Sequence, residues 1–257
     1  MSVKGKEFEE ESGRMNVELV AYTPNPDAVC NLSAGTCVSE DIPVMETSVN
    51  KYRALKGALA SGHESVVEHV SFTFAVSGVS RALTHQLVRH RVASYSQQSQ
   101  RYVNMTDFEY VIPESIKTSK EKIYVGMELD CFECLTPDYE FVHKAYEELM
   151  CKIGETYENL IRAGIPEEDA RYILPNACCT NIVVSMNARE LMHFFRLRCC
   201  TRAQWEIREL ANRMLELVKE VAPTIFANAG ASCVATGRCS EGKKSCRKVK
   251  KSQNVID

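Results

Sequence analysis

The stretch that decides the fold class is VSFTFAV, residues 70–76, in which large apolar side chains alternate with small or polar ones. A period of two residues is typical of a β-strand that buries one face. Residues 17–22 alternate in a similar way, and Ile182–Met186 is a short β-rich run. We predict strands at these three places, with a further candidate at Phe108–Ile112, where Pro113 stops it.

Helical periodicity appears in three later segments. Apolar side chains recur every three or four residues from Tyr139 to Ile161, and a similar stripe runs from Ile207 to Val221. Asn187 is a good helix N-cap residue and directly precedes the third segment, Ala188–Leu197. We predict a helix in each segment.

Strands combined with several long helices predict a single α+β domain over residues 16–232, with a central, mostly antiparallel β-sheet packed by the helices. A polar, flexible leader (1–15) precedes this domain, and a basic, Cys-containing tail (233–257) follows it. We expect residues 23–39 to form a loop, because they mix Pro, Asn, Gly and Cys, and helical structure to begin near Val49.

Composition excludes several classes of protein. The chain has 257 residues, of which 45% are hydrophobic and 25% charged, so it is neither collagen-like nor wholly disordered. It has no apolar run of the roughly 20 residues that a membrane helix needs and no apolar signal segment, so we expect a soluble, cytoplasmic protein without a membrane partner.

Charge is distributed unevenly along the chain. The net charge is −3, but residues 237–257 carry seven Lys or Arg against two acidic residues, so the tail is +5 and the remainder −8. A globally basic nucleic-acid surface is therefore not expected. The tail is either a solvated, flexible end or the one stretch suited to contact with a polyanion.

The chain has 12 cysteines, and its length and lack of a signal segment favour reduced thiols over a disulfide framework. Cys131 and Cys134 have the spacing of half a zinc site, which would need further ligands from distant cysteines, namely Cys233, Cys239 and Cys246. The alternative is a set of partly buried thiols. His63 and His69 are six residues apart, which does not place them on one helical face. We therefore expect no metal.

The densest polar cluster is RHRVASYSQQSQRY, residues 89–102. It holds three arginines and a histidine without a local carboxylate. Such a surplus of donors favours an anion, and phosphate is the natural candidate, because each charge-assisted hydrogen bond is worth about 1.5–3 kcal/mol. The alternative is a solvated or internally paired basic face.

Within this cluster, Arg89-His90-Arg91, seven residues, Ser99, one residue and Arg101 resemble the signature of the flavin-dependent thymidylate synthases. The flanking segments are also similar to that family, and the resemblance covers about residues 50–230. The flanking residues that carry it are Gly62 to Ser65, Glu68, His69, Ala170, Arg171, Leu174, Pro175, Asn187 to Arg189, Leu197, Arg198 and Ala203 to Glu206.

The resemblance implies the fold of that family and its reaction. A methylene carbon from methylenetetrahydrofolate is joined to ring carbon 5 of dUMP and reduced to a methyl group by hydride from reduced FAD, which gives dTMP. NADPH then reduces the flavin again. The resemblance also implies a homotetramer with active sites shared between subunits, and leaves open whether the methylene travels on the flavin or directly.

The same resemblance implies a role for individual residues. Arg198 and Ser99 are the implied catalytic residues. Arg198 polarises a carbonyl of the uracil ring, and Ser99 is assigned to substrate binding and activation, because a serine without a base is a weak nucleophile. The residues implied to bind dUMP are Gln86, Arg89, Gln97, Gln98, Ser99, Gln100, Arg101, Arg171 and Arg198. Those implied to bind FAD are His63, Ser65, Glu68, Arg89, His90, Arg91, Asn187, Arg189, His193, Leu197 and Arg202.

Two other functions fit parts of the sequence. The first is a nonenzymatic nucleotide- or RNA-binding protein that uses the Arg89–Arg101 cluster and the basic tail. The second is another flavin enzyme that accepts a different pyrimidine. Classical thymidylate synthases use a cysteine nucleophile in a Pro-Cys context, and Pro175-Asn176-Ala177-Cys178 does not supply that pair. We expect an enzyme that binds no nucleic acid and needs no cysteine nucleophile.

Overall fold

The structure, a computed structural model, describes residues 15–48, 52–129, 135–239 and 241–246. These residues divide into two compact units. The first unit comprises Gly78–Ala82 and Gln98–Thr180, and the second comprises the other described residues. The mixture of helices with antiparallel sheet confirms the α+β class. The single domain over residues 16–232 stays a prediction.

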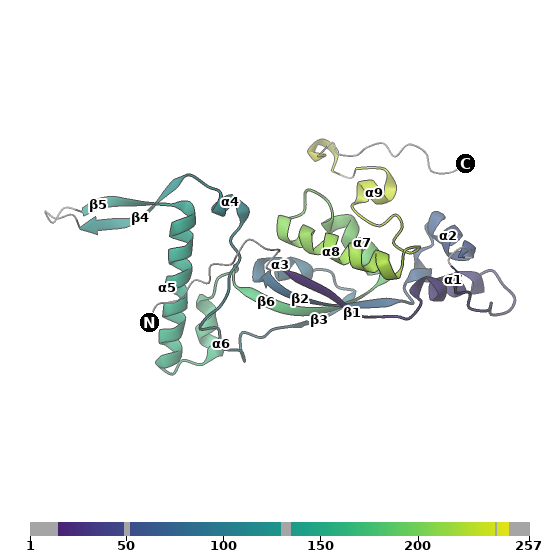
Figure 1. Ribbon diagram of the computed structural model, residues 1–257, viewed down its shortest axis with the longest axis horizontal. Coiled ribbons are helices and arrows are strands. Elements are labelled where there is room, and N and C mark those ends of the chain that lie inside the picture. The colour runs from purple at the N-terminus through teal and green to yellow at the C-terminus, as the bar shows by residue number, and fades with distance from the viewer. Residues whose placement is uncertain (1–14, 49–51, 130–134, 240, 247–257) are drawn as a thin grey trace. The chain divides into compact units, whose positions relative to one another are not determined.

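The second unit is built around a four-stranded sheet (Figure 1). In order across the sheet its strands are β1 (Asn16–Tyr22), β2 (Ser71–Ser80), β6 (Cys179–Asn187) and β3 (Ala93–Gln97). β1 pairs with β2, and β3 pairs with β6, in both cases antiparallel. The predicted strands at residues 17–22, 70–76 and 182–186 are therefore confirmed.

Two long helices, α7 (Ala188–Arg198) and α8 (Trp205–Val221), lie together over one face of this sheet (Figure 1). The alternation in β2 has the expected effect, because Phe72 and Phe74 are fully buried while Thr73 between them is not. The ring of Phe226 lies 5.5 Å from that of Phe72 and 6.0 Å from that of Phe195 in α7. The apolar stripes of both helices and the inner face of β2 thus form one core.

Further helices complete this part of the chain. They are α1 (Pro26–Thr36), α2 (Arg53–Ala60), α3 (Arg81–Leu87) and α9 (Ser232–Thr236), with the 3₁₀ helices η2 (Glu64–Val67) and η4 (Gly242–Lys244). α3 follows β2 directly, and the segment after it leads into β3. The basic segment is thereby carried from the end of a helix into an edge strand of the sheet.

The first unit contains a two-stranded antiparallel hairpin and a long helix. Its elements are α4 (Glu114–Lys117), β4 (Lys122–Leu129), β5 (Leu135–Phe141), α5 (Val142–Arg162), α6 (Glu167–Ala170) and the 3₁₀ helix η3 (Arg171–Ile173). Tyr157 of α5 is fully buried in a cluster with Met105, Ala170 and Cys178. Neither α5, at 21 residues, nor any other described helix has the length and apolar character to span a bilayer.

Three local expectations are wrong. Residues 26–36 are the helix α1 and not a loop, because Pro26 occupies the first turn, where its missing N–H costs nothing. Residues 139–141 belong to β5, so the long helix begins at Val142. Of the strand expected at 108–112, only Tyr110 pairs, in an isolated bridge to Cys178.

A buried carboxylate ties α1 to the segment after α8. Asp27 is 5% exposed, and its two oxygens accept hydrogen bonds from the backbone N–H groups of Thr224 (2.8 Å) and Ile225 (3.0 Å). The Asp27→Ala change leaves both donors without this acceptor. We expect it to lower the free energy of unfolding by about 1–3 kcal/mol.

Urea unfolding of Asp27→Ala beside Asp41→Ala measures this effect. Asp41 is exposed, so its replacement should change the free energy of unfolding by less than about 0.5 kcal/mol. Equal unfolding midpoints for the two variants would show that the Asp27 carboxylate does not hold the two segments together.

Candidate active site

Helix α7 begins with the N-cap that the sequence predicts. Asn187 has an extended backbone, and its side-chain oxygen accepts a hydrogen bond from the backbone N–H of Glu190 at 2.9 Å. This bond satisfies one of the donors that every helix leaves unpaired at its N-terminus. It also fixes where the first turn of α7 starts, and therefore where the Glu190 side chain lies.

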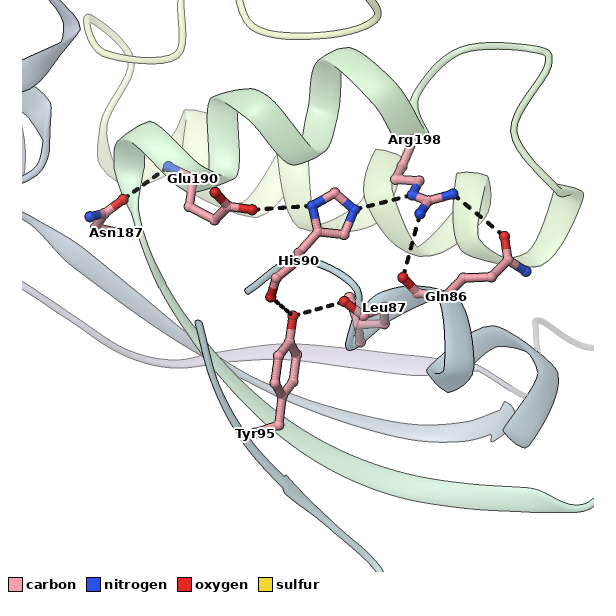
Figure 2. Close-up of polar contacts among 7 residues, drawn as sticks. All are labelled: Gln86, Leu87, His90, Tyr95, Asn187, Glu190 and Arg198. Carbon is pink, nitrogen blue, oxygen red and sulfur yellow. Dashed lines mark hydrogen bonds and ion pairs between the residues drawn. The ribbon is translucent and has the colours of Figure 1, made fainter. Parts of the chain in front are cut away.

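A chain of hydrogen bonds runs from this first turn to the last residue of α7 through a histidine of the basic segment (Figure 2). Nδ1 of His90 lies 3.1 Å from Oε1 of Glu190, and Nε of Arg198 donates to Nε2 of His90 at 3.2 Å. Arg198 has no acceptor atom, so Nε2 of His90 must carry the lone pair. His90 is therefore the Nδ1–H tautomer, which donates to Glu190.

Burial holds this histidine neutral. His90 is 5% exposed, and burial lowers its pKa from the ordinary value of 6.5, with the charges of Arg198 and His193 acting in the same direction and Glu190 acting against them. Burial also lowers the pKa of Arg198, although a guanidinium stays protonated at neutral pH. A neutral imidazole can therefore accept from a permanent cation.

Tyr95, a residue of β3, stabilises the backbone around His90. The hydroxyl of Tyr95 lies 2.8 Å from the carbonyl oxygens of both Leu87 and His90, so it can donate to either of them. Burial raises the pKa of Tyr95, which keeps this hydroxyl protonated. The Tyr95 side chain thereby stabilises the turn between α3 and β3, and Figure 2 shows its hydroxyl beside both carbonyl oxygens.

Gln86, at the end of α3, lies beside the other guanidinium nitrogens of Arg198. Nη1 of Arg198 is 3.5 Å from the side-chain oxygen of Gln86, and Nη2 is 3.4 Å from its carbonyl oxygen. These bonds are long compared with the usual 2.9 Å. Arg198 is therefore anchored at Nε, while its Nη donors have weak partners that a ligand oxygen can replace.

Most of the predicted flavin residues lie at or beside η2, at the start of α7 or on it, and in the turn before β3, whereas Arg202 lies between α7 and α8. His63, Ser65 and Glu68 are exposed around η2, and Glu68 forms an ion pair with Arg189. The ring of His193 is 5.9 Å from that of His90. The remaining residues of this set are exposed: Arg89, Arg91, Leu197, and Arg202, whose Nε donates to the carbonyl of Lys244 at 2.7 Å.

The first unit brings together the two arginines that the resemblance implies for the dUMP phosphate. Nε of Arg101 donates to the Glu168 carboxylate at 2.6 Å, and Nε of Arg171 donates to the Glu168 backbone carbonyl at 3.0 Å. The basic segment thus does have a carboxylate neighbour, which comes from α6. The side chains of Arg101 and Glu168 are 53% and 46% exposed, so this ion pair is weak and replaceable.

The other predicted dUMP residues make local bonds. Gln97 donates to the Thr84 hydroxyl at 2.9 Å within the second unit. In the first unit, the Gln98 carbonyl accepts from Arg81 at 2.6 Å, and the Gln100 amide lies 3.6 Å from the Cys178 sulfur. The Ser99 hydroxyl accepts from the backbone N–H of Arg101 at 3.2 Å. Within the described residues no histidine or carboxylate bonds to Ser99, and its assignment to substrate binding stays a prediction.

His90, Glu190 and His193 also place three possible metal-ligand atoms within 4.8 Å of one another. Nδ1 of His90 already bonds Glu190, and its Nε2 faces the permanent positive charge of Arg198. A cation at this point would meet that charge, so the electrostatics favour the hydrogen-bonded chain over a metal. Cys131 and Cys134 lie outside the described residues, and the absence of a metal stays a prediction.

Comparison with known proteins identifies the family. The sequence model of the family described as "Thymidylate synthase complementing protein" matches residues 18–224. A flavin-dependent thymidylate synthase from Clostridium tetani is 47% identical over 247 residues, which cover 94% of this chain and 96% of the relative. This chain belongs to the flavin-dependent thymidylate synthases.

Further relatives with the same name are more distant. The flavin-dependent thymidylate synthase of Geobacter sulfurreducens is 44% identical, covering 91% of this chain and 94% of its own length, and that of Pyrococcus furiosus is 40% identical, covering 88% and 90%. Membership makes this chain an enzyme of thymidylate synthesis that works with a flavin. The recognition made from residues 89–101 is confirmed, and the nonenzymatic alternative is set aside.

Three residues that shape the site of this flavin-dependent thymidylate synthase are not predicted from the sequence. They are Glu168, Glu190 and Tyr95. A signal existed for Glu190, because Asn187-x-x-Glu190 has the spacing of a capping box. That pattern predicts a glutamate turned back toward the N-cap backbone, whereas the carboxylate bonds His90.

Proposed function

We propose that the chain converts dUMP to dTMP by reductive methylation, with methylenetetrahydrofolate as carbon donor, FAD as hydride carrier and NADPH as reductant. The observation that carries this proposal beyond family membership is the hydrogen-bonded chain Glu190–His90–Arg198, in which the central histidine is buried. It holds one guanidinium at Nε and leaves its Nη donors on weak partners. Such a group suits a ligand carbonyl that gains negative charge during reaction.

The base of dUMP is proposed to lie at Arg198 and Gln86. Methylation at ring carbon 5 requires negative charge to develop on the uracil carbonyls, and a fixed cation stabilises that charge without reorganisation. Nη1 and Nη2 of Arg198 can exchange their bonds to Gln86 for a uracil oxygen.

The phosphate of dUMP is proposed to bind Arg101 and Arg171, with Ser99 and its neighbours Gln97, Gln98 and Gln100 lining the nucleotide. Glu168 bonds both arginines. An exposed ion pair such as Arg101–Glu168 contributes about 0–1 kcal/mol, whereas each charge-assisted bond to phosphate is worth about 1.5–3 kcal/mol. A dianionic phosphate therefore displaces the carboxylate.

The donor set of the second unit fits a flavin dinucleotide. Arg89 and Arg91 are exposed and, across the described ranges, no ion pair neutralises either guanidinium, which suits a pyrophosphate. His63, Ser65, Asn187, Arg189, His193, Leu197 and Arg202 supply further polar and apolar contacts. When bound, the flavin supplies the hydride that reduces the methylene carbon. Glu68 must release Arg189 if both contact the cofactor.

The reaction is proposed to proceed without a cysteine nucleophile. Cys178 is fully buried and Cys179 is 9% exposed, so neither thiol is presented to a substrate. We expect Cys178→Ser and Cys179→Ser to retain kcat within about threefold, since no covalent bond to sulfur is made. Steady-state turnover of dUMP measures this, with retained flavin absorbance as the control for folding. Loss of turnover in a variant that keeps its flavin would contradict the proposal.

The experiment that tests the function begins with the absorbance spectrum of the purified protein supplied with FAD. NADPH should bleach the flavin band, and dUMP with methylenetetrahydrofolate should restore it with stoichiometric formation of dTMP. A protein that binds flavin but ignores dUMP while methylating another pyrimidine nucleotide would favour the second alternative. A protein that stays colourless when supplied with FAD and ignores dUMP would contradict the proposal.

The assembly is proposed to be a homotetramer with shared active sites, in the cytoplasm and without nucleic-acid partners. Exposed apolar side chains on the sheet, Val20 at 52% and Val183 at 41%, support a contact with another copy of the chain. Light scattering during gel filtration measures the stoichiometry.

A further inference from the structure

Glu190 is not among the residues for which the family resemblance implies a role. Its carboxylate nevertheless bonds His90, and His90 in turn bonds Arg198 (Figure 2). The two contacts are 3.1 Å and 3.2 Å long. We propose that Glu190 is a positioning residue that selects the Nδ1–H tautomer of His90 and thereby aims the Arg198 guanidinium at the substrate. The proposal rests on the function of Arg198 stated above.

The tautomer matters because Arg198 can only donate. If the proton of neutral His90 were on Nε2, that N–H would face the N–H of Arg198, and the bond at 3.2 Å would be lost. A carboxylate oxygen beside Nδ1 can only accept, so it requires the proton to be on Nδ1. The Glu190 carboxylate and the Arg198 guanidinium therefore specify the same tautomer from opposite sides of the ring.

Close packing restricts rotation of the His90 imidazole ring. His90 is 5% exposed, and the ring of Phe194 meets its ring at 5.0 Å in a T-shaped contact. Tyr95 holds the His90 backbone carbonyl. Rotation of the imidazole to exchange its nitrogens would break the bonds at both ends, so the direction set at Glu190 is transmitted to Arg198.

The bond from Nε to His90, at 3.2 Å, is the shortest hydrogen bond of the Arg198 guanidinium among the described residues. The contacts of Nη1 and Nη2 with Gln86, at 3.5 and 3.4 Å, are too long to fix the plane of the guanidinium. Without the bond from Nε to His90, the side chain can rotate away from the base. Glu190 thus acts on the reaction without touching the substrate.

Glu190 also lies in the first turn of α7, where a negative charge stabilises the helix dipole. Two substitutions separate that role from positioning. Glu190→Ala removes both the charge and the acceptor. Glu190→Gln removes the charge but keeps a carbonyl oxygen that can accept from Nδ1–H. A purely structural role predicts the same result for both variants, whereas positioning predicts different ones.

We expect Glu190→Ala to lower kcat about 10–100-fold, as is usual when the group that orients a functional side chain is removed, and Glu190→Gln to stay within about threefold of the parent. Glu209→Ala, which removes an exposed carboxylate paired with Arg213 on α8, serves as the matched control and should leave kcat unchanged. Equal values for Glu190→Ala and Glu190→Gln would overturn the proposal.

The tautomer itself is measured independently of turnover, by ¹⁵N NMR of the flavin-loaded enzyme labelled at histidine, with His90 assigned from a His90→Gln sample. The parent and Glu190→Gln should show a protonated Nδ1 and an unprotonated Nε2, and Glu190→Ala should lose this preference. A parent His90 protonated at Nε2 would overturn the proposal. Failure of the parent to convert dUMP would instead reject the proposed function and leave the tautomer result standing.

Discussion

Replacing Arg198 by alanine is expected to lower kcat for dTMP formation by about 10²–10³-fold, the usual cost of removing one preorganised group that stabilises developing negative charge. The variant should fold and keep its flavin, because Arg198 is the last residue of α7 and is not one of the residues that this helix buries. Single-turnover oxidation of the reduced flavin, in the presence of dUMP and methylenetetrahydrofolate, measures this directly.

Two further variants test whether the loss of rate is specific to the guanidinium of Arg198. Arg198→Lys keeps the charge but lacks the Nε donor that bonds His90 and the planar fork, so it should recover only a small part of the lost rate. Arg162→Ala removes a guanidinium paired with Glu158 on the surface of α5 and should have no effect. A kcat for Arg198→Ala within threefold of the parent would show that the guanidinium does not act on the base.

The second large effect is expected on substrate affinity. Arg101→Ala should raise KM for dUMP about 10–100-fold, since one charge-assisted bond to phosphate is worth about 1.5–3 kcal/mol and each 1.4 kcal/mol is tenfold in affinity. The maximal rate should change much less, because the phosphate is remote from the reacting carbon. Initial rates over a range of dUMP concentrations separate the two parameters.

Deoxyuridine, which lacks the phosphate, provides the internal control for this prediction. Its dissociation constant should be the same for the parent and for Arg101→Ala, because the bond in question does not exist in either complex. Equal losses of affinity for dUMP and deoxyuridine would show that Arg101 acts by holding the fold or the base, and the assignment of the phosphate site would then be wrong.

Local periodicity accounts for the parts of the fold that the sequence predicts. The strand at residues 70–76 and the helices at 188–197 and 207–221 each bury one face, so their apolar residues repeat with the period of the element. In the strand at 17–22, the half-buried Val17 and Leu19 alternate with exposed residues. The hairpin β4–β5 was missed for the converse reason. Ile123, Tyr124 and Val125 are consecutive and all more than 40% exposed, so β4 has no alternation to detect.

The candidate site also has residues that the sequence predicts and residues that it does not. The arginines of residues 89–101 are close together in sequence and carry a recognisable pattern, so their association with an anion is predictable from chemistry alone. The carboxylates that organise them are not. Glu190 is 100 residues from His90, and Glu168 is 67 residues from Arg101. No local pattern links groups that only folding brings within 3.2 Å of each other.

The sequence by itself determined the α+β class, the N-cap at Asn187, the basic segment and the family, because each depends on residues that are neighbours along the chain or repeat with a fixed period. Only the tertiary structure decided the protonation of His90, the partner of Arg101 and the direction of Arg198. These depend on distances and burial, and a hydrogen bond or a pKa shift exists only once distant segments have excluded water and brought donor and acceptor together.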